Sequence, residues 1–166
     1  MRKSKIIMLL LALFIAIGVR AQQQQEQPTL EFVMELRVKI DKPFQVGRTP
    51  HGQRTIIPIL GGTFEGPKLK GEILSGGADY QMGDEQTHRT EIEAIYCIRT
   101  DDGVNIHIRN AGLIVMNEGS APYFFTSPHF EAPHGSKYEF LNNAIFVCRP
   151  GRSTMEYLSL LVWMVK

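Results

Sequence analysis

The chain has 166 residues, with 18 Lys or Arg side chains, 17 Asp or Glu side chains and a formal net charge of +1. Because this balance offers no basic patch that would neutralise a phosphate backbone, it argues against a nucleic-acid-binding protein. The length is sufficient for one domain with a sizeable hydrophobic core.

The first 21 residues have the three-part layout of a secretory signal peptide. Basic residues within the first five positions precede an apolar run over 6–19, and Val19 and Ala21 match the residues expected before a cleavage site. The apolar run is shorter than the roughly 20 residues that a helix needs to cross a bilayer, which disfavours an uncleaved membrane anchor. We therefore expect cleavage after Ala21, export to the periplasm or the extracellular space, and no membrane-embedded segment afterwards.

Cleavage at this position would remove four basic residues and leave 14 basic against 17 acidic side chains, a net charge of −3. Residues 22–28 are polar and rich in glutamine, a composition typical of a disordered linker. The folded domain is expected over residues 29–166.

The first strand is predicted over residues 30–40, where apolar residues recur at every second position. The opposite face carries Glu31, Glu35, Arg37 and Lys39, which belong in water. A charged outer face argues against an outer-membrane barrel, whose outer face is apolar.

Further strands are predicted where β-branched, aromatic or alternating apolar residues recur between Gly, Asp and Pro residues. They span residues 54–60, 68–74, 89–100, 104–109, 113–116, 122–130, 144–148 and 155–165. Glycines are expected to break the chain at 61–62 and to form a bulge or kink at 110–112. A short turn or a single helical turn is expected near 138–142, and no segment after residue 28 shows sustained helical periodicity.

This succession of short strands predicts an all-β barrel or sandwich. The chain contains 15 glycines, many of them inside strand patterns, which favours the sharp bends of a small closed barrel. Cys97 and Cys148 lie in predicted strands among apolar neighbours. Two buried thiols are therefore favoured, although export would also permit a disulfide.

Several glycine-rich and aromatic blocks occur in a characteristic order along the chain. They lie at residues 46–54, 61–67, 76–80, 100–103, 123–126 and 138–142. In this pattern the chain closely resembles the family catalogued as domain of unknown function 3237, from about Leu30 to Lys166. The resemblance implies an all-β fold, a single closed or nearly closed antiparallel β-barrel of roughly ten strands with a central cavity. It implies little about function, because the role of the family is mostly unassigned.

The chain departs from the family pattern at several positions. The family usually has Trp where this chain has Tyr80, and often Trp where it has Phe140. Arginines usually stand where this chain has Ile95 and Phe125. If those arginines hold an anionic group in relatives, the resemblance implies a more apolar pocket and a less charged ligand in this protein.

Arg54, Glu65, Asp79 and Tyr80 form a first candidate site, because all four lie beside glycine turns. In a functional interpretation Asp79 lies at the barrel mouth, where partial burial raises its pKa and allows it to shuttle protons. Tyr80 then donates a hydroxyl or stacks on a ligand, with Arg54 and Glu65 as further contacts. In a structural interpretation Arg54 pairs with Asp79 to fix the turn, and Glu65 is exposed.

A second candidate site consists of Tyr123, Glu131, Tyr138 and Asn142. In a functional interpretation these residues are polar anchors, with Glu131 as an acid or base, in a pocket lined by Phe124, Phe125, Phe130 and Phe140. In a structural interpretation the phenylalanines are core residues under a capping turn, and the tyrosine hydroxyls have routine partners.

No metal or cofactor site is predicted. The five histidines are scattered over loops and polar faces without paired ligand spacing. The chain has no phosphate-binding Gly-Lys motif, nucleophile elbow or dinucleotide fingerprint.

The leading interpretation is an exported barrel that holds a small, largely apolar molecule in its cavity. Acid–base chemistry such as isomerisation, cyclisation or elimination would use Asp79 or Glu131 with Tyr80 or Tyr123. A non-catalytic carrier similar to a lipocalin and an envelope interaction module without a pocket are the alternatives. A cavity that contains a carboxyl of raised pKa would favour the enzyme, a dry apolar cavity the carrier, and a filled barrel the interaction module.

Overall fold

The computed structural model of the chain describes residues 27–166, so the expected signal peptide and most of the expected linker lie outside the described residues. The described part contains ten strands and one short 3-10 helix, η1. Their bounds are β1 (Leu30–Ile40), β2 (Phe44–Thr49), β3 (Gly52–Glu65), β4 (Lys70–Ile73), β5 (Ala78–Asp84), β6 (Arg89–Thr100), β7 (Asn105–Val115), β8 (Tyr123–Glu131), η1 (Glu139–Asn143), β9 (Phe146–Pro150) and β10 (Leu158–Val165). No helix in residues 27–166 combines the length and the apolar character needed to cross a membrane.

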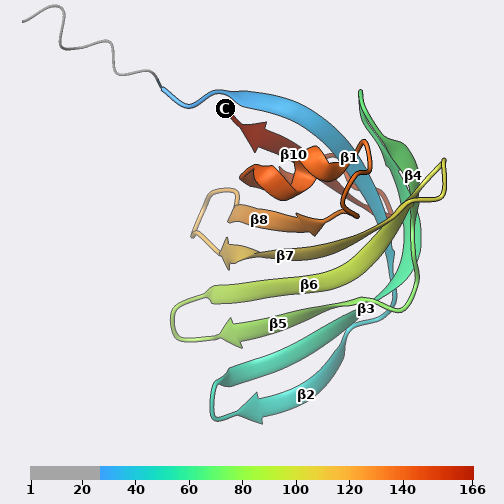
Figure 1. The fold of residues 1–166 in the computed structure, drawn as a ribbon. Coiled ribbons are helices and arrows are strands. Elements are labelled where there is room, and N and C mark those ends of the chain that lie inside the picture. The colour runs from blue at the N-terminus through green and yellow to red at the C-terminus, as the bar shows by residue number, and fades with distance from the viewer. Residues whose placement is uncertain (1–26) are drawn as a thin grey trace, which may run out of the picture.

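The strands form one antiparallel sheet that closes on itself (Figure 1). The order runs β1-β10-β9-β8-β7-β6, and β4 and β5 both connect β6 to β3. Strand β3 then pairs with β1 and closes the ring. The result is an eight-stranded barrel with two extra strands, because β4 and β5 share one position in the wall and β2 pairs only with β3. The predicted closed antiparallel all-β barrel is confirmed.

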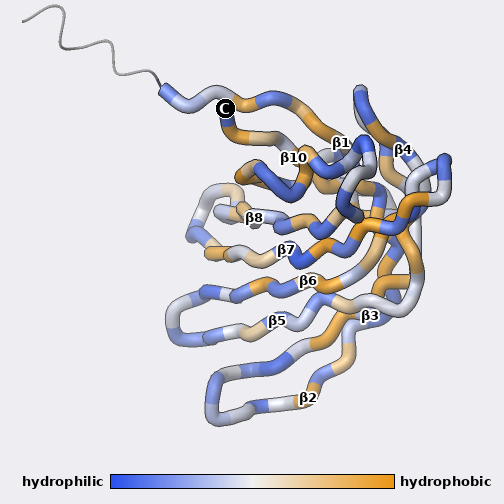
Figure 2. Tube along the Cα trace, in the orientation of Figure 1, coloured by the Kyte–Doolittle hydropathy of each residue, from blue (hydrophilic) through white to orange (hydrophobic). Residues whose placement is uncertain are grey.

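Hydrophilic and hydrophobic residues alternate along much of the sheet, as the colour bands of the tube show (Figure 2), and successive side chains of a strand point to opposite faces of the sheet. Along β1, Met34, Leu36 and Val38 are buried in the core, whereas Glu35 and Arg37 bond to each other on the outer face. Apolar alternation therefore decides which face of β1 points into the barrel, as the sequence predicts.

One end of the barrel is filled with side chains. Phe130 and Phe146 pack edge to face there, with ring centroids 4.9 Å apart. The helix η1 connects β8 to β9 at the same end, and its Leu141 is only 1% exposed. This filled half of the barrel holds most of the hydrophobic core, and we call it the closed end.

The structure differs from the sequence-based prediction in β3. The predicted strand stops at 60, but β3 continues through Gly61 and Gly62 to residue 65. Gly62 has φ +141°, and a Cβ at this position would lie 2.1 Å from the carbonyl oxygen of Arg37 in β1. The glycines therefore bend a continuous strand, because β1 approaches too closely for a side chain.

Two strands and one continuous pairing were not expected. Strands β2 and β5 lie in segments without a predicted strand. The expected bulge at 110–112 is wrong, because β7 pairs in regular register with both β6 and β8 through these residues. Cys97 and Cys148 are free thiols, the first half-buried and the second buried.

Candidate functional site

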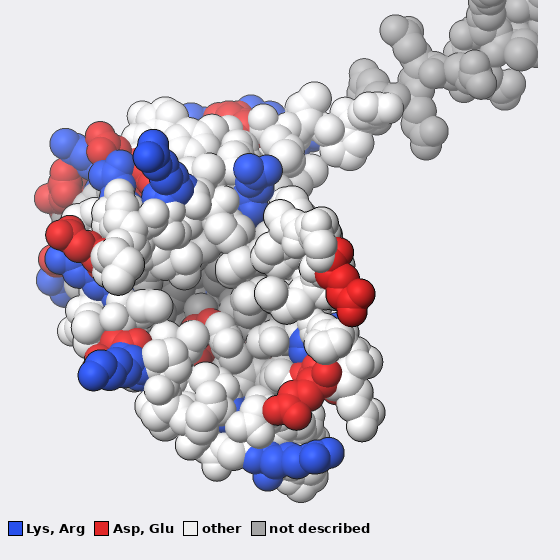
Figure 3. All heavy atoms as spheres, turned by 180° about the vertical axis from the view of Figure 1, so that it is seen from behind, with Lys and Arg blue, Asp and Glu red and all other residues white. Residues whose placement is uncertain are grey.

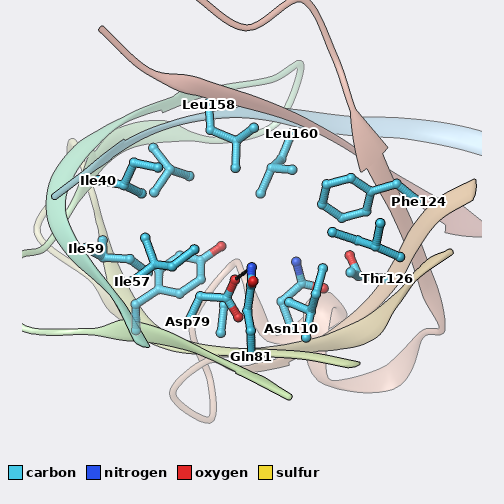
Figure 4. A pocket seen from close by; sticks show the side chains of 15 residues that line it. Ile40, Ile57, Ile59, Asp79, Gln81, Asn110, Phe124, Thr126, Leu158 and Leu160 are labelled. Carbon is cyan, nitrogen blue, oxygen red and sulfur yellow. Dashed lines mark hydrogen bonds between the residues drawn. The ribbon is translucent and has the colours of Figure 1, made fainter. Parts of the chain in front are cut away.

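The half of the barrel opposite to the closed end contains a cavity of about 110 Å³. Seen from behind the view of Figure 1, the molecular surface is hollowed near its centre, and an acidic side chain is visible in the hollow (Figure 3). Most of the cavity wall is apolar, and side chains from β1, β3, β8 and β10 supply much of it (Figure 4). They include Ile40, Ile57, Ile59, Phe124, Leu158 and Leu160.

A polar strip crosses this cavity wall from β5 to β8. Asp79 and Gln81 lie next to each other, and Asn110 and Thr126 follow along the same side, facing the leucines of β10 across the cavity (Figure 4). Tyr96 of β6 also lines the cavity. The cavity is thus amphipathic, with one polar side and one apolar side.

Strand register explains why these polar side chains meet. Asp79 of β5 pairs with Ala94 of β6, and Ala94 pairs with Asn110 of β7. Directly paired residues project to the same face of a sheet. The buried residues Ile106 and Ile108 precede Asn110 at every second position along β7, and this alternation directs the Asn110 side chain inward.

Asp79 is the only carboxyl among the cavity-lining residues of the described chain. Its Oδ2 accepts a hydrogen bond of 2.7 Å from Nε2 of Gln81, whereas its Oδ1 is buried and has no hydrogen-bond partner in residues 27–166. Burial raises the pKa of Asp79 because it penalises the charged form, and the bonds from Gln81 and the Glu93 backbone only partly oppose this rise. Asp79 is therefore a carboxyl suited to gain and lose a proton inside the cavity.

Three further polar atoms at this cavity lack a hydrogen-bond partner in residues 27–166. They are the hydroxyl of Tyr96, Oδ1 of Asn110 and the hydroxyl of Thr126. Burial, reinforced by the nearby Cys148 and Asp79, raises the pKa of Tyr96 far above its usual range, so its hydroxyl stays protonated. Because buried polar groups in proteins are nearly always paired, four such atoms at one cavity indicate a place for a polar ligand group.

The cavity wall carries no positive charge. Among the residues that the structure describes, none of those lining the cavity is Lys, Arg or His. Cys148 lies beside the cavity, and burial raises the pKa of its thiol to about 11, so it remains a neutral thiol. An anionic group would find no cationic partner here.

The structure separates the members of the first predicted site. Asp79 faces the cavity, but its neighbour Tyr80 faces outward with 39% of its surface exposed. Arg54 donates a 3.1 Å hydrogen bond to the backbone carbonyl of Tyr80 and borders an open groove on the outer face, so the expected pair between Arg54 and Asp79 is not formed. Glu65 is exposed at the far end of β3.

The second predicted site is not assembled either. Tyr123 and Glu131 alternate with inward residues of β8 and lie exposed on the outer face. Tyr138 is buried at the closed end, where its hydroxyl donates to Asp102 at 2.7 Å. Asn142 bonds through its amide to both the N–H and the C=O of Ala132, as a structural clamp.

The phenylalanines of this second site are likewise divided. Only Phe124 lines the cavity, whereas Phe130 belongs to the core of the closed end. Ile95 and Phe125 occupy outward positions on β6 and β8, since their immediate neighbours line the lumen. Their departure from the family pattern therefore does not make this cavity more apolar, and that expectation is wrong.

Sequence reasoning missed Gln81, Tyr96, Asn110 and Thr126. The signal that identifies three of them is the continued alternation of their strands. Tyr96 continues the inward series of every second residue that runs from Ile92 to the buried Ile98, and Asn110 and Thr126 likewise continue inward series on β7 and β8. Within residues 27–166, no group of three His, Cys, Asp or Glu side chains is arranged to hold a metal ion.

Comparison with known proteins gives a consistent picture of the fold. The model of a family described as "Protein of unknown function (DUF3237)" matches residues 28–165. A UPF0311 protein of Clostridium acetobutylicum is 34% identical over 136 residues, which cover 74% of this chain and 85% of the relative. A UPF0311 protein of Rhodopseudomonas palustris is 34% identical over 135 residues, which cover 72% of this chain and 87% of the relative.

Solved structures with the same fold come from several organisms. A β-barrel-like protein of Acinetobacter baumannii has a TM-score of 0.75 and 29% identity, and the match covers 87% of this chain and all of that protein. A protein of unknown function from Clostridium acetobutylicum has a TM-score of 0.76 and 32% identity over 84% of this chain and all of that protein. An enzyme from Penicillium herquei, 21% identical, has a TM-score of 0.70 over 87% of this chain and 98% of that enzyme, and shares the fold.

Proposed function

Since the chain belongs to the DUF3237 family of proteins of unknown function, we propose a role from its cavity: it binds a small, largely apolar molecule inside the barrel, and Asp79 transfers a proton to or from it. The observation that carries this proposal is a carboxyl with a buried, unpartnered oxygen inside an otherwise mostly apolar cavity. Titratable groups shifted by burial in a cavity are characteristic of acid–base sites.

The size of the cavity and the residues of its wall support a small, largely apolar ligand. Apolar cavities of about 150 Å³ accommodate a molecule as large as benzene, and this cavity measures about 110 Å³ and is hollowed toward the surface. Isoleucine, leucine and phenylalanine side chains bury the hydrocarbon part of such a ligand, and a few polar groups orient it.

Asp79 supports a reaction in which a proton leaves one atom of the ligand and returns to another. The carboxylate takes the proton, the electron pair shifts within the ligand, and the protonated carboxyl then returns the proton. Isomerisation and cyclisation balance in this way without a co-reactant, and an elimination does so with release of a second product. A carrier would use the same cavity without turnover, but it does not require a carboxyl buried there at a desolvation cost.

A deuterium experiment tests this function. Native mass spectrometry of protein purified from its own host should reveal a co-purifying compound, which is then incubated with the protein in deuterated water. We expect deuterium to appear at carbon with the wild type and not with Asp79→Asn. Glu131→Gln is the matched control, because Glu131 lies on the outer face, and it should behave as the wild type.

Two results would contradict the proposal. If no small molecule co-purifies and no apolar probe binds in the barrel, the cavity is not a binding site. If a compound binds but exchanges no proton, or exchanges it equally with Asp79→Asn, the protein is a carrier.

Export forms a further part of the proposed function and rests on the sequence of residues 1–21. Expression of the full chain in a Gram-negative host, followed by fractionation and N-terminal sequencing, tests it. We expect the protein in the periplasm or the medium with Gln22 as its first residue. Retention in the cytoplasm with residues 1–21 intact would contradict export.

A further inference from the structure

We infer that the barrel selects neutral molecules with a hydroxyl group at one end of an apolar body, and that Ala94 determines this selectivity by leaving a slot between Asp79 and Asn110. This inference rests on the proposed function, because it names the class of molecule that the cavity receives.

The slot follows from strand register. Asp79, Ala94 and Asn110 stand directly opposite one another on β5, β6 and β7, and all three line the cavity. Neighbouring strands lie about 4.8 Å apart, so the backbones of Asp79 and Asn110 are separated by roughly 10 Å. On the strand between them, Ala94 contributes only a methyl group, and the Gln81 side chain, which bonds to Asp79, borders the slot on the β5 side. The labelled side chains of both residues lie on the same side of the cavity (Figure 4). A larger side chain at position 94 would occupy this space.

The polar atoms around the slot match a hydroxyl group. Oδ1 of Asp79 and Oδ1 of Asn110 are unpartnered acceptors in the described chain, and the hydroxyls of Tyr96 and Thr126 are unpartnered as well. A ligand hydroxyl donates one hydrogen bond and accepts another, so it can serve an acceptor and a hydroxyl donor together. Buried polar atoms left without a partner are costly, and a ligand that pairs them gains correspondingly in affinity.

The charges of the cavity exclude other head groups. A carboxylate or phosphate would lie beside Asp79 with no Lys, Arg or His among the described lining residues to compensate it. An ammonium group would require Asp79 to be ionised, and burial opposes that ionisation. A neutral hydroxyl meets neither obstacle.

Four small probes that share one aromatic ring test the inference: toluene, benzyl alcohol, benzoate and benzylamine. Binding to wild type and to Ala94→Val is measured by ligand-observed NMR titration at pH 7. The control is Ala111→Val, the same substitution at an outward position of β7. Thermal unfolding checks that all three proteins are folded.

We expect the wild type to bind benzyl alcohol about tenfold more tightly than toluene, a ratio equivalent to about 1.4 kcal/mol. Benzoate should not bind, and benzylamine should bind more weakly than the alcohol. In Ala94→Val the ratio of the two affinities should fall to about one, whereas Ala111→Val should keep the tenfold preference.

The outcomes distinguish a failure of the proposed apolar binding site from a failure of the inferred slot at Ala94. If none of the probes binds, toluene included, the proposed apolar binding site is itself wrong. If toluene binds as tightly as benzyl alcohol, or if Ala94→Val keeps the preference, the slot is wrong and the apolar site stands. Tighter binding of benzylamine or benzoate than of benzyl alcohol would also overturn the inferred selectivity.

Discussion

At the scale of single residues, the side of the barrel wall on which a carboxyl lies decides whether its pKa is lowered or raised. On the outside, Glu31 bonds to Lys166 and Lys68, and these partners lower its pKa to about 2. Asp102 also has a lowered pKa, because Thr100, Tyr138 and Lys137 bond to its carboxylate. Asp79 has no cationic partner among the described residues and faces the lumen, so its pKa moves in the opposite direction.

This difference predicts how stability depends on pH in Asp79→Asn. Because the pKa of Asp79 is raised on folding, its favourable contribution is complete below the pKa of an unfolded aspartate and is lost as pH rises through the folded value. Asparagine cannot ionise and can still accept the bond from Gln81. At pH 7 we therefore expect the variant to unfold at a higher temperature than the wild type.

Thermal unfolding followed by circular dichroism between pH 4 and pH 8 checks this prediction. The difference between the two proteins should shrink toward acidic pH, where Asp79 is protonated in both the folded and the unfolded state. A variant that is less stable by the same amount at every pH would show that the Asp79 carboxyl supports the fold.

One of the two sequence-based interpretations places Asp79 at the barrel mouth with Tyr80 beside it, whereas in the structure Asp79 lines the cavity and Tyr80 faces outward. In β5 the lumen-facing residues Asp79 and Gln81 are polar, whereas the outward residues Tyr80 and Met82 are largely apolar. This reverses the usual pattern of an apolar inside, and the proximity of Tyr80 to a glycine turn, on which its assignment to the site rests, does not indicate the face to which its side chain points. Because successive residues of a strand point to opposite faces, Asp79 and Tyr80 cannot both face the lumen, but this argument applies only once β5 is known to be a strand.

At the scale of elements, the long alternating strands were predictable and the short ones were not. The strand at 30–40 has the same bounds as predicted, and so does the strand at 89–100. Strand β2 pairs on one side only and exposes Phe44 and Val46, so neither face shows a buried pattern. The partner change of β3 at Gly61 and Gly62 depends on tertiary pairing, which local sequence does not encode.

The bend in β3 predicts different costs for two glycine substitutions. Gly62→Ala adds a methyl group 2.1 Å from the Arg37 carbonyl oxygen at φ +141°, so it must separate β1 from β3. We expect it to lower the free energy of unfolding by about 3 kcal/mol or more. Gly76 also has a positive φ, +102°, but a Cβ there meets nothing within 4 Å. Gly76→Ala should cost only about 1–2 kcal/mol.

Urea unfolding of both variants under identical conditions measures these costs. Comparison with Gly76→Ala removes the part of the loss that comes from backbone conformation alone. Equal losses in the two variants would show that the close approach of β1 to β3 at Gly62 is not a constraint on the barrel.

At the scale of the whole molecule, the two halves of the barrel differ in how their interior is filled. The closed end carries the aromatic pair Phe130 and Phe146 and the helix η1 with Leu141. The open half carries the cavity and its unpartnered polar atoms. Stability therefore rests mainly on residues that do not line the cavity.

The barrel also predicts the state of the two cysteines. Cys97 lies between the inward-facing residues Tyr96 and Ile98 and so faces outward, whereas Cys148 is buried in the core. Strands β7 and β8 separate their strands in the wall, so a disulfide cannot form without unfolding. We expect the protein to keep two free thiols, with Cys148 alkylated by iodoacetamide at least tenfold more slowly than Cys97, because Cys148 is buried and the pKa of its thiol is about 11.

Mass spectrometry of the native protein after timed alkylation measures both rates, and the same reaction in denaturant is the control. In denaturant the two thiols should react at similar rates. An intact mass that shows a disulfide, or faster labelling of Cys148 in the native protein, would contradict this arrangement.

The closed end of the barrel restricts how a small molecule can enter and leave the cavity. In the described part of the chain, Phe130, Phe146 and η1 fill the closed end, so a molecule must leave the cavity through the same opening by which it entered. If the cavity binds a small molecule as proposed, it holds one such molecule at a time, and the next can bind only after the first has dissociated. If the protein is an enzyme, its product should compete directly with its substrate, and departure rather than chemistry can set the pace of turnover.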